Sequence, residues 1–210
     1  MRLGVDNMYS AMENFGLLKK TGIDLPGEAG TIMHKKEIMK AVELATVSFG
    51  QSFQVTPIQM AVTVASLING GNRITPHLAV KSVSPETEEV FMYPYSENII
   101  SDAAGEILQE ILEQVVENGT GRNAFVEGWH VAGKTATSQT LPRGSGKYIA
   151  SFVAFAPADD PQILAIVIIN NPKGVYYGGQ VAAPVIRHLF ENILPYYAPG
   201  KNDIVDMVPE

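Results

Sequence analysis

The sequence contains no cysteine among its 210 residues, which excludes disulfides, thiolate nucleophiles and thiolate-bound metals together. It also lacks an excess of positive charge, because its formal net charge is −7 at pH 7. Nucleic acid is therefore not expected as a partner, since binding a phosphate backbone depends on Lys and Arg side chains that displace its counterions.

Long hydrophobic runs are absent as well. The longest apolar stretch, residues 163–169, has the length of a strand, whereas a membrane-spanning helix needs about 20 apolar residues. Residues 1–6 lack the apolar region that a signal peptide carries. The sequence predicts neither a metal nor another cofactor, because its histidines lie without metal-ligand spacing at His34, His77, His130 and His188.

The composition that remains is that of a globular chain. Hydrophobic residues make up 46% and charged residues 18%, which suits a packed core. At about 150 residues per domain, the length predicts one domain, or one domain and a piece of another. Apolar spacing predicts helices over residues 6–18, 36–47, 57–68, 102–116 and 182–194, and strands over 126–139, 148–156 and 163–169.

Short signals refine this assignment. Thr56 can cap the helix that begins at Pro57, and Gln59 completes a capping box. The turn at residues 157–161 is too short for a crossover, so the strands on either side of it must be antiparallel. We therefore predict an α+β fold, with an antiparallel sheet and helices packed on it. The polar, turn-rich segment 199–210 is interpreted as a linker or tail.

Residues 128–135 match the P-loop pattern Gly-x-x-x-x-Gly-Lys-Thr. A phosphate site of that kind needs a buried strand before the loop and a helix after it, so that backbone amides hold the phosphate. The preceding residues read as a loop, and Pro142, Gly144 and Gly146 oppose a helix afterwards. The context argues against a nucleotide site, which stays only as an alternative.

A second interpretation of the same segment places Lys134-Thr135-Ala136-Thr137 on a strand. Alternation then puts Lys134 and Ala136 on one side and Thr135 and Thr137 on the other. Such a strand can present a cation and hydroxyls along a cleft, to hold a carboxylate and to offer an amide to an oxyanion. Taken alone, the same residues also fit an ordinary exposed strand with a single lysine.

The wider sequence resembles class B penicillin-binding proteins, which are monofunctional peptidoglycan transpeptidases, and Lys134-Thr135-Ala136 stands where that family has a Lys-Thr-Gly box. The resemblance covers residues 3–194. It depends on blocks that follow the family's order: Lys20-Thr21-Gly22-Ile23-Asp24-Leu25-Pro26-Gly27-Glu28, Ser48-Phe49-Gly50-Gln51, Val55-Thr56-Pro57-Ile58-Gln59-Met60-Ala61 with Asn69-Gly70-Gly71, Asn118-Gly119-Thr120-Gly121, residues 131–139, residues 150–157, and Tyr177-Gly178-Gly179 before Ala182-Ala183-Pro184.

The resemblance implies roles for the strand residues. Lys134 and Thr137 would be catalytic, Lys134 in the proton and electrostatic network around the nucleophile and Thr137 through a backbone N–H in the oxyanion hole. Thr135, Ala136 and Thr137 would bind substrate, and the two hydroxyls would hold the carboxylate of a D-Ala-D-Ala stem peptide or a β-lactam. Ala136 departs from the family's usual glycine, and its methyl group can crowd a substrate backbone.

The family's nucleophile belongs to a Ser-x-x-Lys box, and no Ser-x-x-Lys occurs in this chain. Residues 1–198 are therefore expected to form the C-terminal part of a transpeptidase domain without its nucleophile, inactive alone. Two literal box matches are interpreted as decoys. Lys20-Thr21-Gly22 is expected at a helix C-terminus capped by Gly22, and Ser96-Glu97-Asn98 in the lead-in to a helix.

Three hypotheses follow. The chain is part of a penicillin-binding D,D-transpeptidase, a non-catalytic scaffold module of the same fold, or, least supported, a P-loop nucleotide binder. The resemblance implies a parent protein anchored in the bacterial cytoplasmic membrane and acting at its outer face in cell-wall synthesis. Without the rest of the domain, this chain is expected to self-associate or to stay bound to the missing half.

Overall fold

The structure is a computed structural model that describes residues 3–142 and 144–197. The segment 199–210, interpreted above as a linker or tail, lies outside the described residues. The chain divides into two compact units, residues 1–105 and residues 106–210. Helices combine with antiparallel strand pairs, so the predicted α+β class is confirmed.

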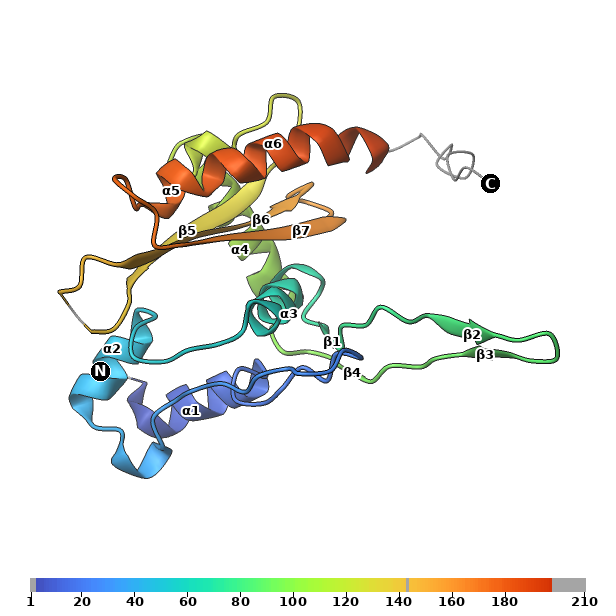
Figure 1. Cartoon of the computed structure of the whole chain (residues 1–210), viewed down its shortest axis with the longest axis horizontal. Helices are drawn as coiled ribbons and strands as arrows, with labels where there is room; N and C mark the ends of the chain where they lie inside the picture. The colour runs from blue at the N-terminus through green and yellow to red at the C-terminus, as the bar shows by residue number, and fades with distance from the viewer. Residues whose placement is uncertain (1–2, 143, 198–210) are drawn as a thin grey trace. The chain divides into compact units, whose positions relative to one another are not determined.

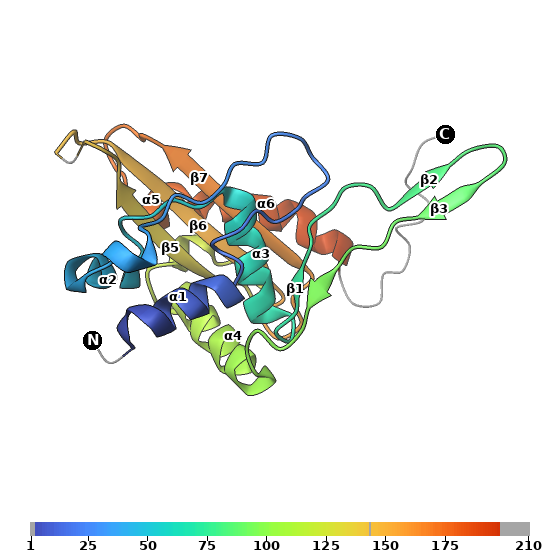
Figure 2. The same cartoon turned by 90° about the horizontal axis from the view of Figure 1, so that it is seen from below.

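The first unit consists of short helices and two small hairpins. Its helices are α1 (Gly4–Asn14), the 3-10 turn η1 (Lys36–Ile38), α2 (Ala41–Ser48) and α3 (Pro57–Ile68). Strand β1 (Arg73–Ile74) pairs with β4 (Tyr95–Ser96), and β2 (Lys81–Val83) pairs with β3 (Glu88–Val90) in the hairpin that extends away from this unit's helices (Figure 2). A small core is formed by Met12, Met39, Leu44 and Val47.

Helix α1 ends earlier than predicted. Gly16 adopts φ +73°, and the Leu17 N–H donates to Met12 O at 2.9 Å, which closes the helix with a left-handed residue. Gly22 was therefore wrongly predicted to cap this helix. Lys20-Thr21-Gly22 instead lies in a turn, where the Thr21 N–H and hydroxyl donate to the Glu28 carboxylate at 2.6 and 2.7 Å.

The helix predicted over residues 36–47 is interrupted. Residues 36–38 form the turn η1, and Met39 returns to an extended backbone with ψ 112°. Helix α2 then starts at Ala41, and its Glu43 carboxylate accepts from the Lys40 N–H at 2.9 Å. That carboxylate caps the helix start, which explains why two elements replace one.

The start of α3 agrees with the prediction. Thr56 Oγ1 accepts from the Gln59 N–H at 3.2 Å, and Gln59 Oε1 accepts from the Thr56 N–H at 3.0 Å. Pro57 occupies the first helical turn. Sequence reasoning also predicted a buried helix, and from Ile58 to Ile68 every residue of α3 is buried or half-buried.

The second unit is built on a three-stranded antiparallel sheet in the order β5-β6-β7. Its strands are β5 (Ala132–Gln139), β6 (Tyr148–Ala156) and β7 (Ile163–Asn170). Helix α4 (Asp102–Glu117) begins at the end of the first unit and leads into η2 (Arg122–Ala124). Helices α5 (Gly178–Val181) and α6 (Ala183–Ile193) lie across one face of the sheet, and η3 (Leu194–Tyr197) follows (Figure 1).

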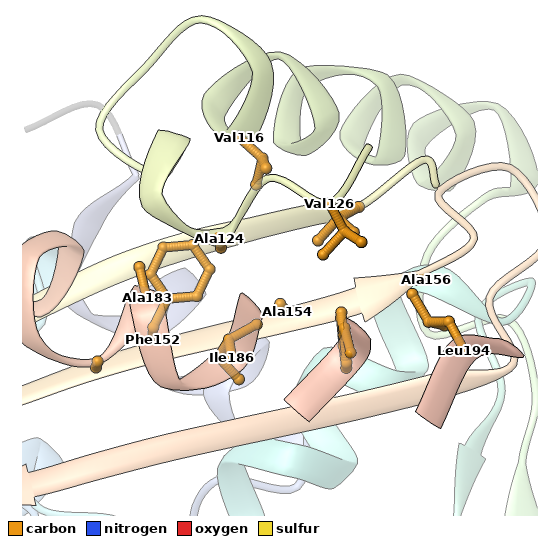
Figure 3. Packing of buried hydrophobic residues seen from close by; sticks show 12 residues of the cluster. Val116, Ala124, Val126, Phe152, Ala154, Ala156, Ala183, Ile186 and Leu194 are labelled. Atoms are coloured by element: carbon orange, nitrogen blue, oxygen red, sulfur yellow. The ribbon is translucent and has the colours of Figure 1, made fainter. Parts of the chain in front are cut away.

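The core of the second unit lies between the sheet and α6. Phe152 and Ala154 of β6 pack with Ile186 and Phe190 of α6, and none of these side chains is exposed. Figure 3 shows Val116, Ala124 and Val126 entering the same cluster from the segment before β5. The alternate residues Ala150, Phe152, Ala154 and Ala156 are all buried, as period-two burial on one face requires, and Phe155 of the other set is buried as well.

Two boundaries in this unit differ from the predictions. The strand predicted over residues 126–139 begins only at Ala132, because Gly128 has φ +78° and the Trp129 N–H donates to Val126 O within a turn. The last helix was predicted over residues 182–194, whereas a short helix α5 precedes α6 and starts at Gly178. Strand β6 has the predicted bounds.

Candidate active site

The segment singled out by the sequence lies on β5, at one edge of the described sheet. Its register with β6 is continuous, with Lys134 opposite Val153 and Ala136 opposite Ser151. At the end of this ladder the Thr140 N–H donates to Lys147 O at 2.9 Å. Backbone groups alternate sides along a strand, so even-numbered residues of β5 bond to β6.

The odd-numbered residues therefore direct their backbone N–H and C=O groups away from β6. Thr135 and Thr137 both belong to this set, and within the described residues no strand pairs with that edge. The Lys134 ammonium confirms the direction, since it donates to Thr135 O at 3.0 Å. The Thr137 N–H, the group expected to help bind an oxyanion, consequently points off the open edge of β5.

The side chains of the segment separate as alternation predicted. Lys134 and Ala136 are exposed, whereas Thr135 and Thr137 are half-buried on the face that carries α5 and α6. The two threonines line a pocket of about 370 Å³. Its other lining residues come from the η2 segment and from the start of α5, and they are Gly119, Thr120, Arg122, Asn123, Tyr177, Gly178, Gly179 and Gln180.

Close backbone packing forms the pocket. The Gly178 N–H donates to Thr137 Oγ1 at 3.1 Å, and Asn123 Nδ2 donates to Gly179 O at 2.7 Å. A Cβ on Gly178 would lie 2.2 Å from Ser151 O, and one on Gly179 would lie 2.4 Å from Thr120 O. Glycine is thus required at both positions for α5 to approach the sheet and the η2 segment.

This arrangement is suited to binding an anion. In its bond to Gly178, Thr137 Oγ1 is the acceptor, so the hydroxyl hydrogen of Thr137 remains available to donate. Thr135 offers a second hydroxyl in the same pocket, and Lys134 supplies positive charge near the edge. A carboxylate held by these hydroxyls would lie beside a backbone N–H that can stabilise a developing oxyanion.

Sequence reasoning missed part of this pocket. Arg122 and Asn123 directly follow the block Asn118-Gly119-Thr120-Gly121, which indicates the family but predicts no contact with the strand. Gly178 and Gly179 were likewise matched to the family without a contact being assigned to them. No local signal joins these segments to β5, because residue 178 meets residue 137 only through the fold.

The other sequence candidates lie in different settings. Lys134 and Thr135 of the P-loop match fall in the middle of β5 and not at the start of a helix, so that geometry is not met. Ser96 ends β4 and accepts from the Arg73 guanidinium at 3.4 Å, before α4 begins at Asp102. In the described part of the chain, no three His, Asp or Glu side chains gather to hold a metal ion.

Known proteins match this chain along most of its length. The sequence model of a family described as penicillin binding protein transpeptidase domain matches residues 1–191. Stage V sporulation protein D of Bacillus subtilis is 41% identical over 212 aligned residues, covering 97% of this chain and 33% of that protein. Peptidoglycan D,D-transpeptidase FtsI of Escherichia coli K12 is 34% identical over 192 residues, which cover 89% of this chain and 31% of that protein. The chain spans about a third of the length of these relatives.

Solved structures agree in fold. Penicillin-binding protein 3 of Mycobacterium tuberculosis, complexed with aztreonam, matches with a TM-score of 0.82 at 27% identity, over 90% of this chain and 47% of that one. The transpeptidase domain of penicillin-binding protein 3 from Burkholderia pseudomallei gives a TM-score of 0.78 at 27% identity, over 94% of this chain and 59% of that one. The fold that the sequence blocks implied is thereby confirmed.

Proposed function

Since this chain belongs to the transpeptidase domain family of penicillin-binding proteins, we propose that the protein containing it is a peptidoglycan D,D-transpeptidase. A serine outside these residues would attack the carbonyl between the two D-Ala residues of a stem peptide, expelling the terminal D-Ala. The amine of a neighbouring stem peptide would then take the acyl group, and the serine would regain its proton. β-Lactams would acylate the same serine.

One observation supports the contribution of this chain above others. The open edge of β5 combines an outward Thr137 N–H with the Thr135 and Thr137 hydroxyls in one pocket. An acyl-transfer site needs a donor aimed at the oxyanion and a hold on the rest of the substrate, and this edge offers both. A scaffold module without catalytic function would not require that combination.

This placement supports the roles that the family resemblance implies for individual residues. Lys134 would stabilise negative charge and assist proton transfer at the serine, and the Thr137 N–H would bind the oxyanion. The hydroxyls of Thr135 and Thr137 would hold the substrate carboxylate, while Ala136 would line the path of the substrate backbone. The exposed position of Ala136 on the Lys134 face is consistent with contact to a ligand.

Labelling with a fluorescent penicillin tests the proposal. We expect the full-length protein to form one stoichiometric covalent adduct, and this 210-residue chain alone to form none, because no Ser-x-x-Lys is present in it. Mass spectrometry locates the adduct. A full-length protein that stays unlabelled would favour the scaffold hypothesis, and an adduct on a serine of this chain would overturn the assignment of the site.

We also infer a cellular location and an assembly. The protein would act in cell-wall synthesis at the outer face of the cytoplasmic membrane, anchored by a segment outside this chain. In the described residues no helix is long and apolar enough to cross a membrane. The 210-residue chain would self-associate or stay bound to the missing half of the domain, since the β5 edge pairs with no other strand among the described residues and open strand edges recruit other chains. Light scattering at several concentrations tests this, and a concentration-independent monomer would contradict it.

A further inference from the structure

Arg122 is the charged residue of the β5 pocket that the proposed mechanism leaves without a role. Its backbone position is fixed, because Gly121 and Ala124 on either side are buried and the adjacent Asn123 bonds to Gly179 O. The Arg122 side chain is exposed and lines the pocket together with Thr135 and Thr137. One pocket is therefore lined by an arginine with an anchored backbone and by two threonines.

The charge balance of the pocket favours an anionic ligand. Within the part of the chain that the structure describes, the residues that line the pocket include no Asp or Glu, and Arg122 gives them a formal charge of +1. No ion pair or hydrogen bond engages the Arg122 guanidinium among the described residues, in contrast to Arg187, which pairs with Glu191 at 2.8 Å. Planar guanidinium groups bind carboxylates through two parallel hydrogen bonds.

Lys134 does not fill the same role. Its side chain leaves β5 on the opposite face from the threonines, and its ammonium reaches round to Thr135 O at the open edge. The two cations thus approach the edge from different faces. Arg122 lines the pocket with the Thr135 and Thr137 hydroxyls, whereas Lys134 is not among the residues that line it.

We propose that Arg122 is a specificity residue that selects donors ending in a free carboxylate, by forming a charge-assisted pair with that carboxylate while Thr135 and Thr137 hydrogen-bond to it. The proposal rests on the proposed transpeptidase function. Its consequence is that removing the charge of Arg122 penalises anionic donors and spares neutral ones of the same shape.

A matched pair of thioesters tests this in the full-length protein. N-benzoyl-D-alanyl-thioglycolate has a carboxylate on its leaving group, and its primary amide does not. We expect Arg122→Gln to lower kcat/KM for the carboxylate donor by about 10- to 100-fold, the effect of losing a hydrogen bond to a charged group, and to leave the amide unchanged. Arg122→Lys should recover part of the loss, and Arg187→Gln, an exposed arginine on α6 outside the pocket, should match the wild type.

The outcomes separate the two proposals. An equal loss on both thioesters would assign Arg122 a structural role and overturn the inference, as would no loss on either. Added salt provides a measurement on the wild type itself: kcat/KM should fall with ionic strength for the carboxylate donor and stay level for the amide. A wild-type protein that neither turns over a thioester nor binds labelled penicillin would refute the proposed function, and the inference with it.

Discussion

Replacing Gly178 with alanine should damage the site without adding any polar change. The new Cβ would lie 2.2 Å from Ser151 O and 2.6 Å from Ala136 O, both of them backbone atoms of the sheet. A carbon and an oxygen need about 3.3 Å, so the start of α5 must move away by about 1 Å. That movement stretches the 3.1 Å hydrogen bond from the Gly178 N–H to Thr137 Oγ1.

Two magnitudes follow from this displacement. Forcing a methyl group into tightly packed backbone costs about 1–3 kcal/mol of folding free energy. Misplacing a substrate-binding group by about 1 Å can lower the rate about 10²-fold, since acyl transfer depends on close alignment. The Thr137 hydroxyl would lose its fixed orientation, and α5 would no longer define the wall of the pocket.

The assay is the second-order rate constant for acylation of the full-length protein by a fluorescent penicillin, with thermal unfolding measured on the same samples. Gly30→Ala is the matched control, because a methyl group on Gly30 would meet no atom within 4 Å. We expect Gly178→Ala to acylate about 10²-fold more slowly while still unfolding cooperatively, and Gly30→Ala to behave as wild type. Wild-type acylation by Gly178→Ala would refute the packing argument.

Three further predictions concern neighbouring groups. In the full-length protein, Lys134→Ala should slow acylation by about 10²- to 10⁴-fold, the range for a positioned acid–base or electrostatic group. Lys20→Ala should have little effect. A larger loss in Lys20→Ala than in Lys134→Ala would mean that Lys20-Thr21-Gly22, and not Lys134-Thr135-Ala136, belongs to the active site. Ala136→Gly should preserve or raise the acylation rate, because it removes a methyl group from the edge that a ligand approaches, and a large drop would mean that the methyl makes a needed contact. Glu113 accepts from His130 at 2.6 Å and raises the pKa of that imidazole by hydrogen bonding and charge. Because His130 is exposed and Glu113 only half-buried, the pair should stabilise the fold by less than about 1 kcal/mol below about pH 6.5, and that gain should vanish as pH rises through the raised pKa. Urea unfolding of wild type and Glu113→Gln across this range measures it, and a pH-independent difference would contradict it.

The sequence predicted the ends of a helix or strand correctly where the residues that set those ends lie within the element itself. Helix α3 starts where Thr56, Pro57 and Gln59 predicted, because all the capping partners lie within one turn. Strand β6 was predicted with its observed bounds, since burial on the α6 face imposes a period of two on a run of apolar residues. The side-chain faces of β5 followed from the same alternation.

Other features depend on contacts between distant residues. The early end of α1 involves Gly16, where a Cβ would lie 2.3 Å from Arg73 Nη1. The pocket forms because residues 119–123, β5 and α5 converge, as the bonds from Gly178 to Thr137 and from Asn123 to Gly179 record. Sequence spacing holds no information on such convergence, so it does not predict that Arg122 lines the pocket.

Ala136 stands where the family usually has glycine, and packing of the sheet does not require a glycine at this position. Gly133 is the glycine of β5 that packing demands, because a Cβ there would lie 2.6 Å from both Phe152 Cε1 and Val153 O. Ala136, in contrast, has its methyl group exposed on the Lys134 face, and the register with Ser151 continues undisturbed through it. The sheet therefore accepts either residue at position 136. Where the Ala136→Gly variant unfolds at the same temperature as the wild type, a difference in rate reports contact with the ligand, which makes that substitution a probe of how closely a substrate approaches the β5 edge.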